Sequence, residues 1–162
     1  MFIYIARHAW AYEFGDLRWS DDSLRELDPE GAERYMRVVQ ALAERGFAPE
    51  VVATSPYVRC QQTAEIIAKH TSAQPEITNL EALEPHSDLA ALIEWSRKSG
   101  CKEICWVGHA PDVGLMASAL IGDAHANIRF AKGAIAAIRF DEQLDHAAGQ
   151  LYWHATAKSL GL

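Results

Sequence analysis

Short apolar runs alternate along this chain with longer segments in which apolar residues recur every three or four positions. Phe2–Ala6, Val51–Thr54 and Ile104–Gly108 are such runs, and runs this brief are typical of strands buried on both faces. Glu76–Leu80 is a shorter, less apolar candidate. We therefore expect six strands, over residues 2–6, 51–54, 76–80, 104–108, 134–140 and 151–154.

Four helices are predicted between the strands. Asp28 can accept a hydrogen bond as N-cap, Pro29 fits the first helical position, and Gly46 can end the helix in a left-handed conformation. Ser55-Pro56 has the same cap-plus-proline pattern and predicts a second helix that extends to about Lys69. Further helices are expected over residues 88–98 and 111–121.

This alternation predicts an α/β fold, a three-layer α/β/α sandwich with a mostly parallel sheet. The last two strands are joined by a polar turn near residues 141–149, so they form a hairpin that adds an antiparallel edge. No linker or repeat divides residues 1–162, which we interpret as a single domain. Residues 10–27 are irregular and rich in acidic and aromatic residues, as expected of a loop that borders a site.

Composition narrows the possible functions. The chain is 49% hydrophobic and 23% charged, with a net charge of −7. An acidic surface argues against partners such as nucleic acid or an anionic membrane. No segment is apolar for long enough to span a membrane or to serve as a signal peptide. The three cysteines have no disulfide spacing, so free thiols and a cytoplasmic location are expected.

The chemistry-bearing residues follow the predicted strands. Arg7-His8 follows the first, Arg59 lies shortly after the second, and His109 directly follows Ile104–Gly108. In an open α/β sheet, ligands bind beyond the carboxyl ends of the strands. Two histidines and two arginines would therefore meet in one cationic pocket, whose composition suits a phosphoryl group.

Each arginine also has a simpler interpretation. Arg59 lies in the first turn of a predicted helix, where a cation costs about 0.3–1 kcal/mol unless an anion binds there; alternatively, it is exposed and solvated. Arg7 follows a buried strand and needs an anionic partner. That partner is either a phosphate or a carboxylate of the acidic loop, such as Asp16 or Asp22.

The histidines can act as nucleophile and hydrogen-bond donor. A neutral His8 nitrogen can attack phosphorus, and His109 can stabilise the charge that develops on the phosphate oxygens. The alternative is that both are buried, hydrogen-bonded structural residues. Metal binding is disfavoured because no His-x-His or His-x₃-His spacing occurs and the arginines would repel a cation. Ser55 lacks a nucleophile-elbow motif, and a capping role accounts for it.

At these residues the chain resembles the histidine phosphatase (phosphoglycerate-mutase-like) superfamily, and in particular its SixA-type phosphohistidine phosphatase branch. The resemblance covers nearly the whole length and rests on an ordered set of motifs: Arg7-His8-Ala9, residues 23–31 and 55–64, Leu83-Glu84-Pro85, residues 107–111 and Lys132-Gly133-Ala134.

The resemblance implies that His8 is the phosphorylated nucleophile and that Arg7, Arg59 and His109 form the phosphate pocket. It implies no metal and no organic cofactor, and it places Arg25 at the rim. Two departures stand out. Ala9 replaces a glycine found in many relatives, and Ala82 stands where relatives commonly have an acidic residue, with Glu81 and Glu84 only nearby.

We therefore expect a metal-independent phosphatase that hydrolyses phosphohistidine on a protein, such as a histidine-phosphotransfer domain. A departing imidazole has a pKa near 6.5 and needs a general acid less than an alkoxide does. The short stretch between Leu80 and Asp88 leaves no room for a lid. A phosphatase of small phosphomonoesters and a non-catalytic phosphate-binding module stay open as alternatives. Trp10 and Trp19 either rim the entrance or pack.

Overall fold

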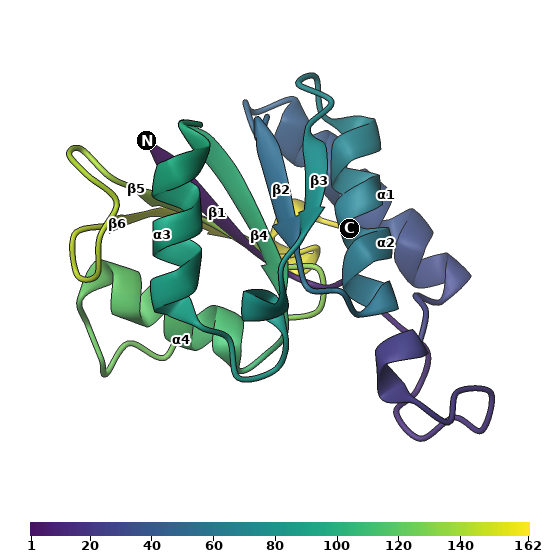
Figure 1. Cartoon of the computed structure of the whole chain (residues 1–162). Helices are drawn as coiled ribbons and strands as arrows, with labels where there is room; N and C mark the ends of the chain where they lie inside the picture. Colours follow the sequence, from purple (N-terminus) through teal and green to yellow (C-terminus); the bar gives the residue numbers. More distant parts are fainter.

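The computed structural model describes all residues, 1–162, and contains one six-stranded sheet (Figure 1). The strands lie in the order β3-β2-β4-β1-β5-β6. Their bounds are β1 (Phe2–Arg7), β2 (Val51–Thr54), β3 (Glu76–Asn79), β4 (Glu103–Gly108), β5 (Ile135–Arg139) and β6 (Gln150–Ala155). The four strands β1 to β4 are parallel, whereas β5 pairs antiparallel with both β1 and β6.

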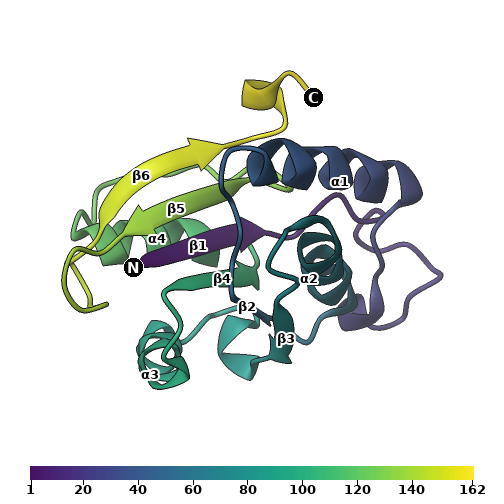
Figure 2. The same ribbon diagram turned by 90° about the horizontal axis from the view of Figure 1, so that it is seen from above.

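Two helices cover each face of the sheet (Figure 2). The helices are α1 (Pro29–Ala43), α2 (Val58–His70), α3 (Leu89–Ser99) and α4 (Asp112–Ile121). Tyr35 of α1 and Ile67 of α2 belong to one hydrophobic cluster. Leu92 of α3 and Met116 of α4 belong to the cluster on the opposite face. The predicted α/β/α sandwich with its antiparallel hairpin is therefore confirmed.

Two of the helices begin where the sequence predicted, each after an aspartate that caps it. The Asp28 carboxylate accepts a hydrogen bond from the Gly31 N–H at 2.7 Å, ahead of Pro29 at the first position of α1. Asp88 caps α3 through the Ala91 N–H at 3.0 Å. Gly46 has a φ of +94°, the left-handed conformation that glycine adopts without strain.

The start of α2 differs from the prediction. The helix begins at Val58 after Tyr57, and no side chain caps it. Ser55 instead extends the sheet, because its N–H donates to the Val107 carbonyl at 3.0 Å. Its side chain is fully buried, is hydrogen-bonded to His109, and accepts at 3.4 Å from the N–H of Tyr57, the residue that precedes the helix. The predicted capping role of Ser55 is therefore wrong, because its hydroxyl does not cap α2 and is hydrogen-bonded to His109.

Three short 3₁₀ helices complete the structure, over Asp22–Leu24, Glu81–Leu83 and Lys158–Leu160. Residues 10–27 are otherwise irregular, as expected, and contain one isolated β-bridge, between Ala11 and Leu27. α4 begins at Asp112, one residue after the predicted start. None of the helices combines the length and the apolar character needed to cross a membrane.

Candidate active site at the carboxyl edge of the sheet

The four predicted site residues lie at the edge where β1, β2 and β4 end. Arg7 is the last residue of β1 and His8 follows it, His109 follows β4, and Arg59 is the second residue of α2. Three of the side chains are nearly inaccessible: His8 is 7% exposed, and Arg59 and His109 are 4% exposed. The tertiary structure brings His8, Arg59 and His109 together, since the His8 and His109 rings are 5.5 Å apart and Arg59 contacts His109. Arg7 is near enough for its charge to act on both rings.

The backbone around His8 is held from three sides. The His8 N–H donates to the Gly108 carbonyl at 3.0 Å, and the His8 carbonyl accepts from the Gly133 N–H at 3.0 Å. The Ala9 N–H donates to the Thr63 hydroxyl at 3.0 Å, and that hydroxyl donates to the Arg59 carbonyl at 2.6 Å. These bonds tie the residue after β1 to β4, to α2 and to the segment before β5.

The His8 ring is arranged as a neutral nucleophile. Nδ1 lies 2.8 Å from the Ala9 carbonyl oxygen. Because a carbonyl can only accept, Nδ1 carries the proton and Nε2 keeps its lone pair. Burial, aided by the charges of Arg59, His109 and Arg7, lowers the pKa of His8 to about 3, although the bond to Ala9 opposes this shift. The ring is therefore uncharged at neutral pH, with a single proton on Nδ1.

Arg7 has no carboxylate partner. Its Nη1 donates to the Phe130 carbonyl at 2.8 Å, and its buried Nε has no hydrogen-bond partner. Asp16 pairs instead with Arg18 at 2.6 Å. The alternative that Asp16 or Asp22 neutralises Arg7 is thus wrong, because both carboxylates are engaged by other arginines.

Arg59 is buried among polar groups rather than solvated. Its Nη1 donates to the Asp22 carbonyl at 2.8 Å, and its Nη2 lies 3.1 Å from the Asp22 carboxylate. Nη2 also lies 3.3 Å from Nδ1 of His109. The Nε of Arg59, like that of Arg7, is buried without a hydrogen-bond partner. The site therefore contains two desolvated guanidinium groups that each have a donor to offer to an oxyanion.

His109 lies between Arg59 and Ser55. Its Nε2 is 2.9 Å from the Ser55 hydroxyl, while Nδ1 faces Arg59. Burial, with the charge of Arg59 next in size, lowers the pKa of His109 to about 4. The Tyr57 ring packs against the imidazole at 4.9 Å. The second histidine is thus also neutral at neutral pH and has a fixed orientation.

Asp22, Ser55 and Thr63 also belong to this network, although none of them is predicted from the sequence as a site residue. Ser55 and Thr63 belong to the 55–64 motif, and their place in that motif is a signal that could have identified them. Asp22 is an expected alternative partner of Arg7, not of Arg59. Its carboxylate is shared by Arg59 and Arg25, and the bond to Arg25 is 2.8 Å long.

The remaining candidates lie outside the network. Neither Glu81 nor Glu84 forms an ion pair or a side-chain hydrogen bond with the four site residues, so no carboxylic acid is supplied by that stretch. Trp10 packs against Gly31 and Gly133 and stacks on Arg34, whereas Trp19 stacks on Tyr12 and Arg18. No group of three or more His, Cys, Asp or Glu residues is arranged to hold a metal ion.

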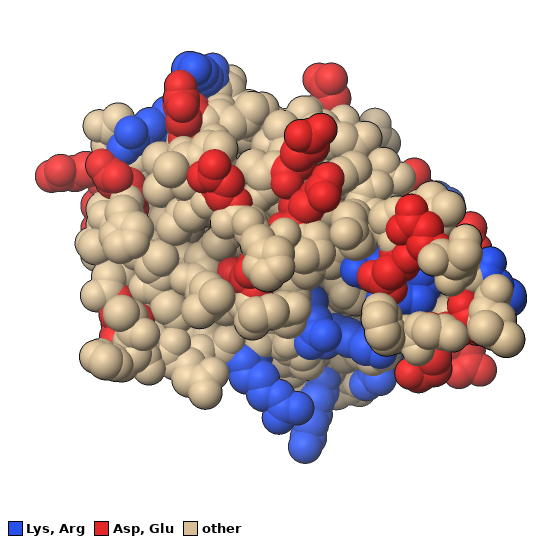
Figure 3. Space-filling view, turned by 60° about the horizontal axis from the view of Figure 1, so that its bottom comes forward, with Lys and Arg blue, Asp and Glu red and all other residues tan.

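Charge on this side of the molecule differs from the overall balance. Figure 3 shows lysine and arginine side chains gathered at the end of the molecule where the parallel strands finish. Arg129 is exposed and Lys132 half-buried, and neither forms an ion pair. A protein of net charge −7 thus presents a basic surface around the site.

Comparison with known proteins agrees with this architecture. The structure is similar to the protein histidine phosphatase SixA complexed with tungstate, with a TM-score of 0.85, 24% identity and 99% coverage of both chains. It is also similar to a phosphoserine phosphatase from Entamoeba histolytica in complex with 3-phosphoglyceric acid, with a TM-score of 0.69, 15% identity and 96% coverage of both.

Two sequence matches are more specific. An uncharacterized protein of Picosynechococcus sp. is 31% identical over 144 residues, which cover 86% of this chain and 85% of that relative. Residues 3–84 match the histidine phosphatase superfamily (branch 1). Since that match spans half of the chain, and the relative most of it, this protein is a member of the histidine phosphatase superfamily.

Proposed function

We propose that this protein is a phosphatase that hydrolyses phosphohistidine on a protein, with His8 as the covalent nucleophile. One observation carries the proposal: a neutral His8, with its Nε2 lone pair free, lies among Arg7, Arg59 and His109. Two of these neighbours have buried guanidinium donors without partners. Membership in a family of phosphatases supports the reaction class.

The reaction would proceed in two in-line transfers. In the first, His8 Nε2 forms a bond to phosphorus as the bond from phosphorus to the substrate imidazole breaks. The other nitrogen of the substrate ring carries a proton, so the ring departs as neutral imidazole, and phosphorylated His8 keeps the Nδ1 proton that it donates to the Ala9 carbonyl. In the second, a water oxygen bonds to phosphorus, the electron pair of the breaking His8–phosphorus bond returns to Nε2, and both protons of the water leave with the phosphate as dihydrogen phosphate. Arg7, Arg59 and His109 stabilise the phosphoryl oxygens throughout.

The choice of substrate follows from the leaving group. No carboxylic acid forms a hydrogen bond or an ion pair with the site histidines, and the only carboxylate of the network, Asp22, is held ionised by Arg25 and Arg59. An imidazole whose other nitrogen is protonated leaves as a neutral ring, the conjugate base of an acid with a pKa near 6.5, and needs no strong acid, whereas an alkoxide does. This chemistry favours a phosphoramidate over a phosphate ester.

A small phosphomonoester is the second candidate. Only residues 80–88 separate β3 from α3, so no inserted segment in that connection covers the site. A site without an inserted lid in that connection would admit small esters as well as a phosphorylated side chain. The phosphoserine phosphatase with the same fold illustrates that this architecture can accommodate a small phosphorylated molecule.

The test is transfer of radiolabelled phosphate from a phosphohistidine-bearing phosphotransfer protein. Brief mixing should leave acid-labile label on the wild-type protein and release inorganic phosphate. His8→Ala should abolish the label and lower turnover at least about 10³-fold. His146→Ala, which changes an exposed histidine far along the chain, is the matched control. Near-normal turnover by His8→Ala would reject the mechanism, and binding without label or product would favour a non-catalytic module.

A further inference from the structure

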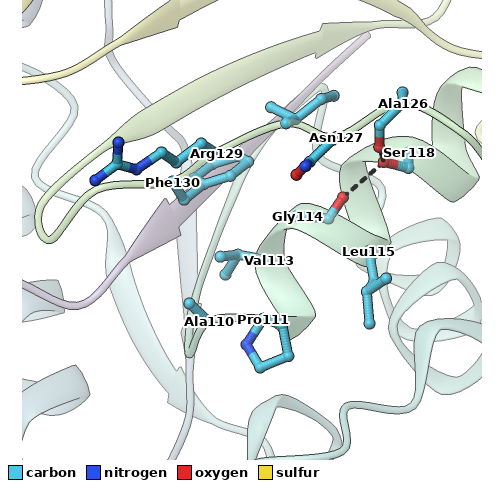
Figure 4. A pocket seen from close by; sticks show the side chains of 11 residues that line it. Ala110, Pro111, Val113, Gly114, Leu115, Ser118, Ala126, Asn127, Arg129 and Phe130 are labelled. Carbon is cyan, nitrogen blue, oxygen red and sulfur yellow. Dashed lines mark hydrogen bonds between the residues drawn. The ribbon is translucent and has the colours of Figure 1, made fainter.

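A hollow of about 340 Å³ lies next to the active site, between the first two turns of α4 and the segment 126–130 (Figure 4). We call it the α4 groove. Ala110 and Pro111 form one end of it and directly follow His109. At the other side is Phe130, whose carbonyl accepts the hydrogen bond from Arg7. The groove is therefore continuous with the residues that would hold the phosphoryl group.

The walls of the α4 groove are apolar and firmly built. Val113, Ile128 and Phe130 line it, and Leu115 stands at its rim with 62% of its surface exposed. The Ser118 hydroxyl is bonded to the Gly114 and Ala126 carbonyls at 3.0 and 2.6 Å, which fastens the segment to the helix. Leu115 thus extends the apolar surface of the hollow out to its rim.

Polar groups at the groove have no partners of their own. The Asn127 side chain points toward the middle of the hollow in Figure 4 and makes no hydrogen bond within the protein. The Arg129 guanidinium extends away along the rim and forms no ion pair. Lys132 adds a second unpaired cation between this segment and β5. The groove thus combines apolar walls with one amide at its middle, and it is basic on the side nearest Arg7.

We propose that the α4 groove binds the polypeptide segment that flanks the phosphohistidine of a protein substrate. An apolar side chain of that segment would enter the hollow, and a carboxylate would pair with Arg129. The basic rim on an otherwise acidic protein supplies the charge complementarity. This inference rests on the proposed function and names what the enzyme recognises besides the phosphoryl group.

The test compares two substrates that share the scissile bond: a phosphohistidine-bearing phosphotransfer protein and the free amino acid phosphohistidine. Leu115→Glu and Arg129→Glu should each lower kcat/KM for the phosphoprotein by about tenfold or more. Hydrolysis of free phosphohistidine should stay at the wild-type level, because neither residue contacts the four site residues. The loss caused by Arg129→Glu should shrink as salt is raised.

Leu151→Glu and Arg139→Glu are matched controls. Both residues are exposed, and they lie in β6 and β5 at the end of the strands away from the active site, where Arg139 is opposite Phe2 in the sheet register and forms an ion pair with Asp141. Both variants should hydrolyse the phosphoprotein at the wild-type rate. If wild type hydrolyses both substrates and the groove variants keep full activity on the phosphoprotein, the groove proposal fails while the proposed function stands.

Two other outcomes are also decisive. Equal losses on both substrates would overturn the groove proposal, since the variants would then be acting on the reaction itself. If the wild-type protein hydrolyses neither substrate, the proposed function fails first.

Discussion

At the scale of single residues, His109 is set apart by two neighbours that fix the position of its proton. Arg59 Nη2 can only donate, so Nδ1 accepts and Nε2–H donates to the Ser55 hydroxyl in this structure. A hydroxyl can donate as well as accept. If Ser55 donates to Nε2 instead, Nδ1 becomes the protonated nitrogen and can donate to a phosphoryl oxygen. Ser55 therefore allows His109 to change tautomer while it remains neutral.

Ser55→Ala should lower kcat on the order of tenfold, the effect of losing about 1.4 kcal/mol from one buried hydrogen bond. The fall should be larger in kcat than in KM, because the Nδ1 donor is needed most as charge redistributes on the phosphoryl group. The nitrogen chemical shifts of His109 can be measured by NMR with an oxyanion bound. In Ser55→Ala they should show less of the Nδ1-protonated tautomer than in the wild-type protein. An unchanged tautomer balance would contradict this role.

The arginines show where residue-level prediction fell short. The sequence indicated that Arg7 and Arg59 lie near one another and that acidic loop residues are close by. It offered Asp22 as one possible partner of Arg7, whereas Asp22 pairs with Arg59 and Arg25. The choice between neighbouring cations depends on the path of residues 10–27. That path contains little regular structure, so no periodic pattern reveals it.

At the scale of elements, the start of α1 fits tightly against the segment that follows His8. A Cβ added at Gly31 would stand 2.4 Å from the Trp10 Cβ and 2.7 Å from the Trp10 carbonyl oxygen. Trp10 also packs against Gly133, whose φ of +69° is left-handed. A Cβ added at Gly133 would lie 2.9 Å from the Trp10 ring. Two glycines thus make room for one tryptophan, which identifies Trp10 as a packing residue.

Gly31→Ala should therefore destabilise the protein by about 1–3 kcal/mol, as overpacking does elsewhere. In an unhindered helix the same change would stabilise by up to about 1 kcal/mol, so the sign is informative. The free energy of unfolding in urea is the measurement. Glu30→Ala, at the neighbouring exposed position, is the control and should change stability by less than about 1 kcal/mol. A more stable Gly31→Ala variant would show that the contact relaxes freely.

Most elements followed from local signals, and the exception is instructive. Asp28 and Asp88 cap their helices as free N-caps do, with carboxylates that have no stronger partner nearby. Ser55 has the same sequence signature but is fully buried at the sheet edge, where the His109 ring takes its hydroxyl. The sequence pattern of a helix cap involves only a few neighbouring residues. Here the hydrogen bond with His109, which is 54 positions away along the chain, replaces the cap interaction.

At the scale of the whole molecule, the buried histidines link stability to pH. Folding lowers the pKa of His8 to about 3 and that of His109 to about 4, from ordinary values near 6.5. Between these values the unfolded chain binds protons that the folded protein does not. Their contribution to stability is therefore fully present above about pH 6.5 and is lost progressively as the pH falls.

Each histidine should add a slope of up to about 1.4 kcal/mol per pH unit to the unfolding free energy below about pH 6.5. Unfolding in urea, measured between about pH 7 and pH 5, should show wild type losing stability faster than His8→Gln or His109→Gln. His125→Gln changes an exposed histidine and should follow the wild-type curve. Parallel curves for all four proteins would mean that the buried rings titrate normally.

The sequence by itself determined the layers of this protein and the residues that end its central strands. The apolar runs predict the buried strands, and Arg7-His8, Arg59 and His109 follow these runs in the sequence. Because ligands bind beyond the carboxyl ends of parallel strands, this local pattern is enough to place the four residues at one site.

Only the tertiary structure decided the partners: Asp22 on Arg59, Ser55 on His109, Trp10 between two glycines, and the groove beside α4. Hydrogen bonds and close packing depend on distances of a few tenths of an ångström between residues far apart in the chain. No pattern within a short stretch of sequence contains that information.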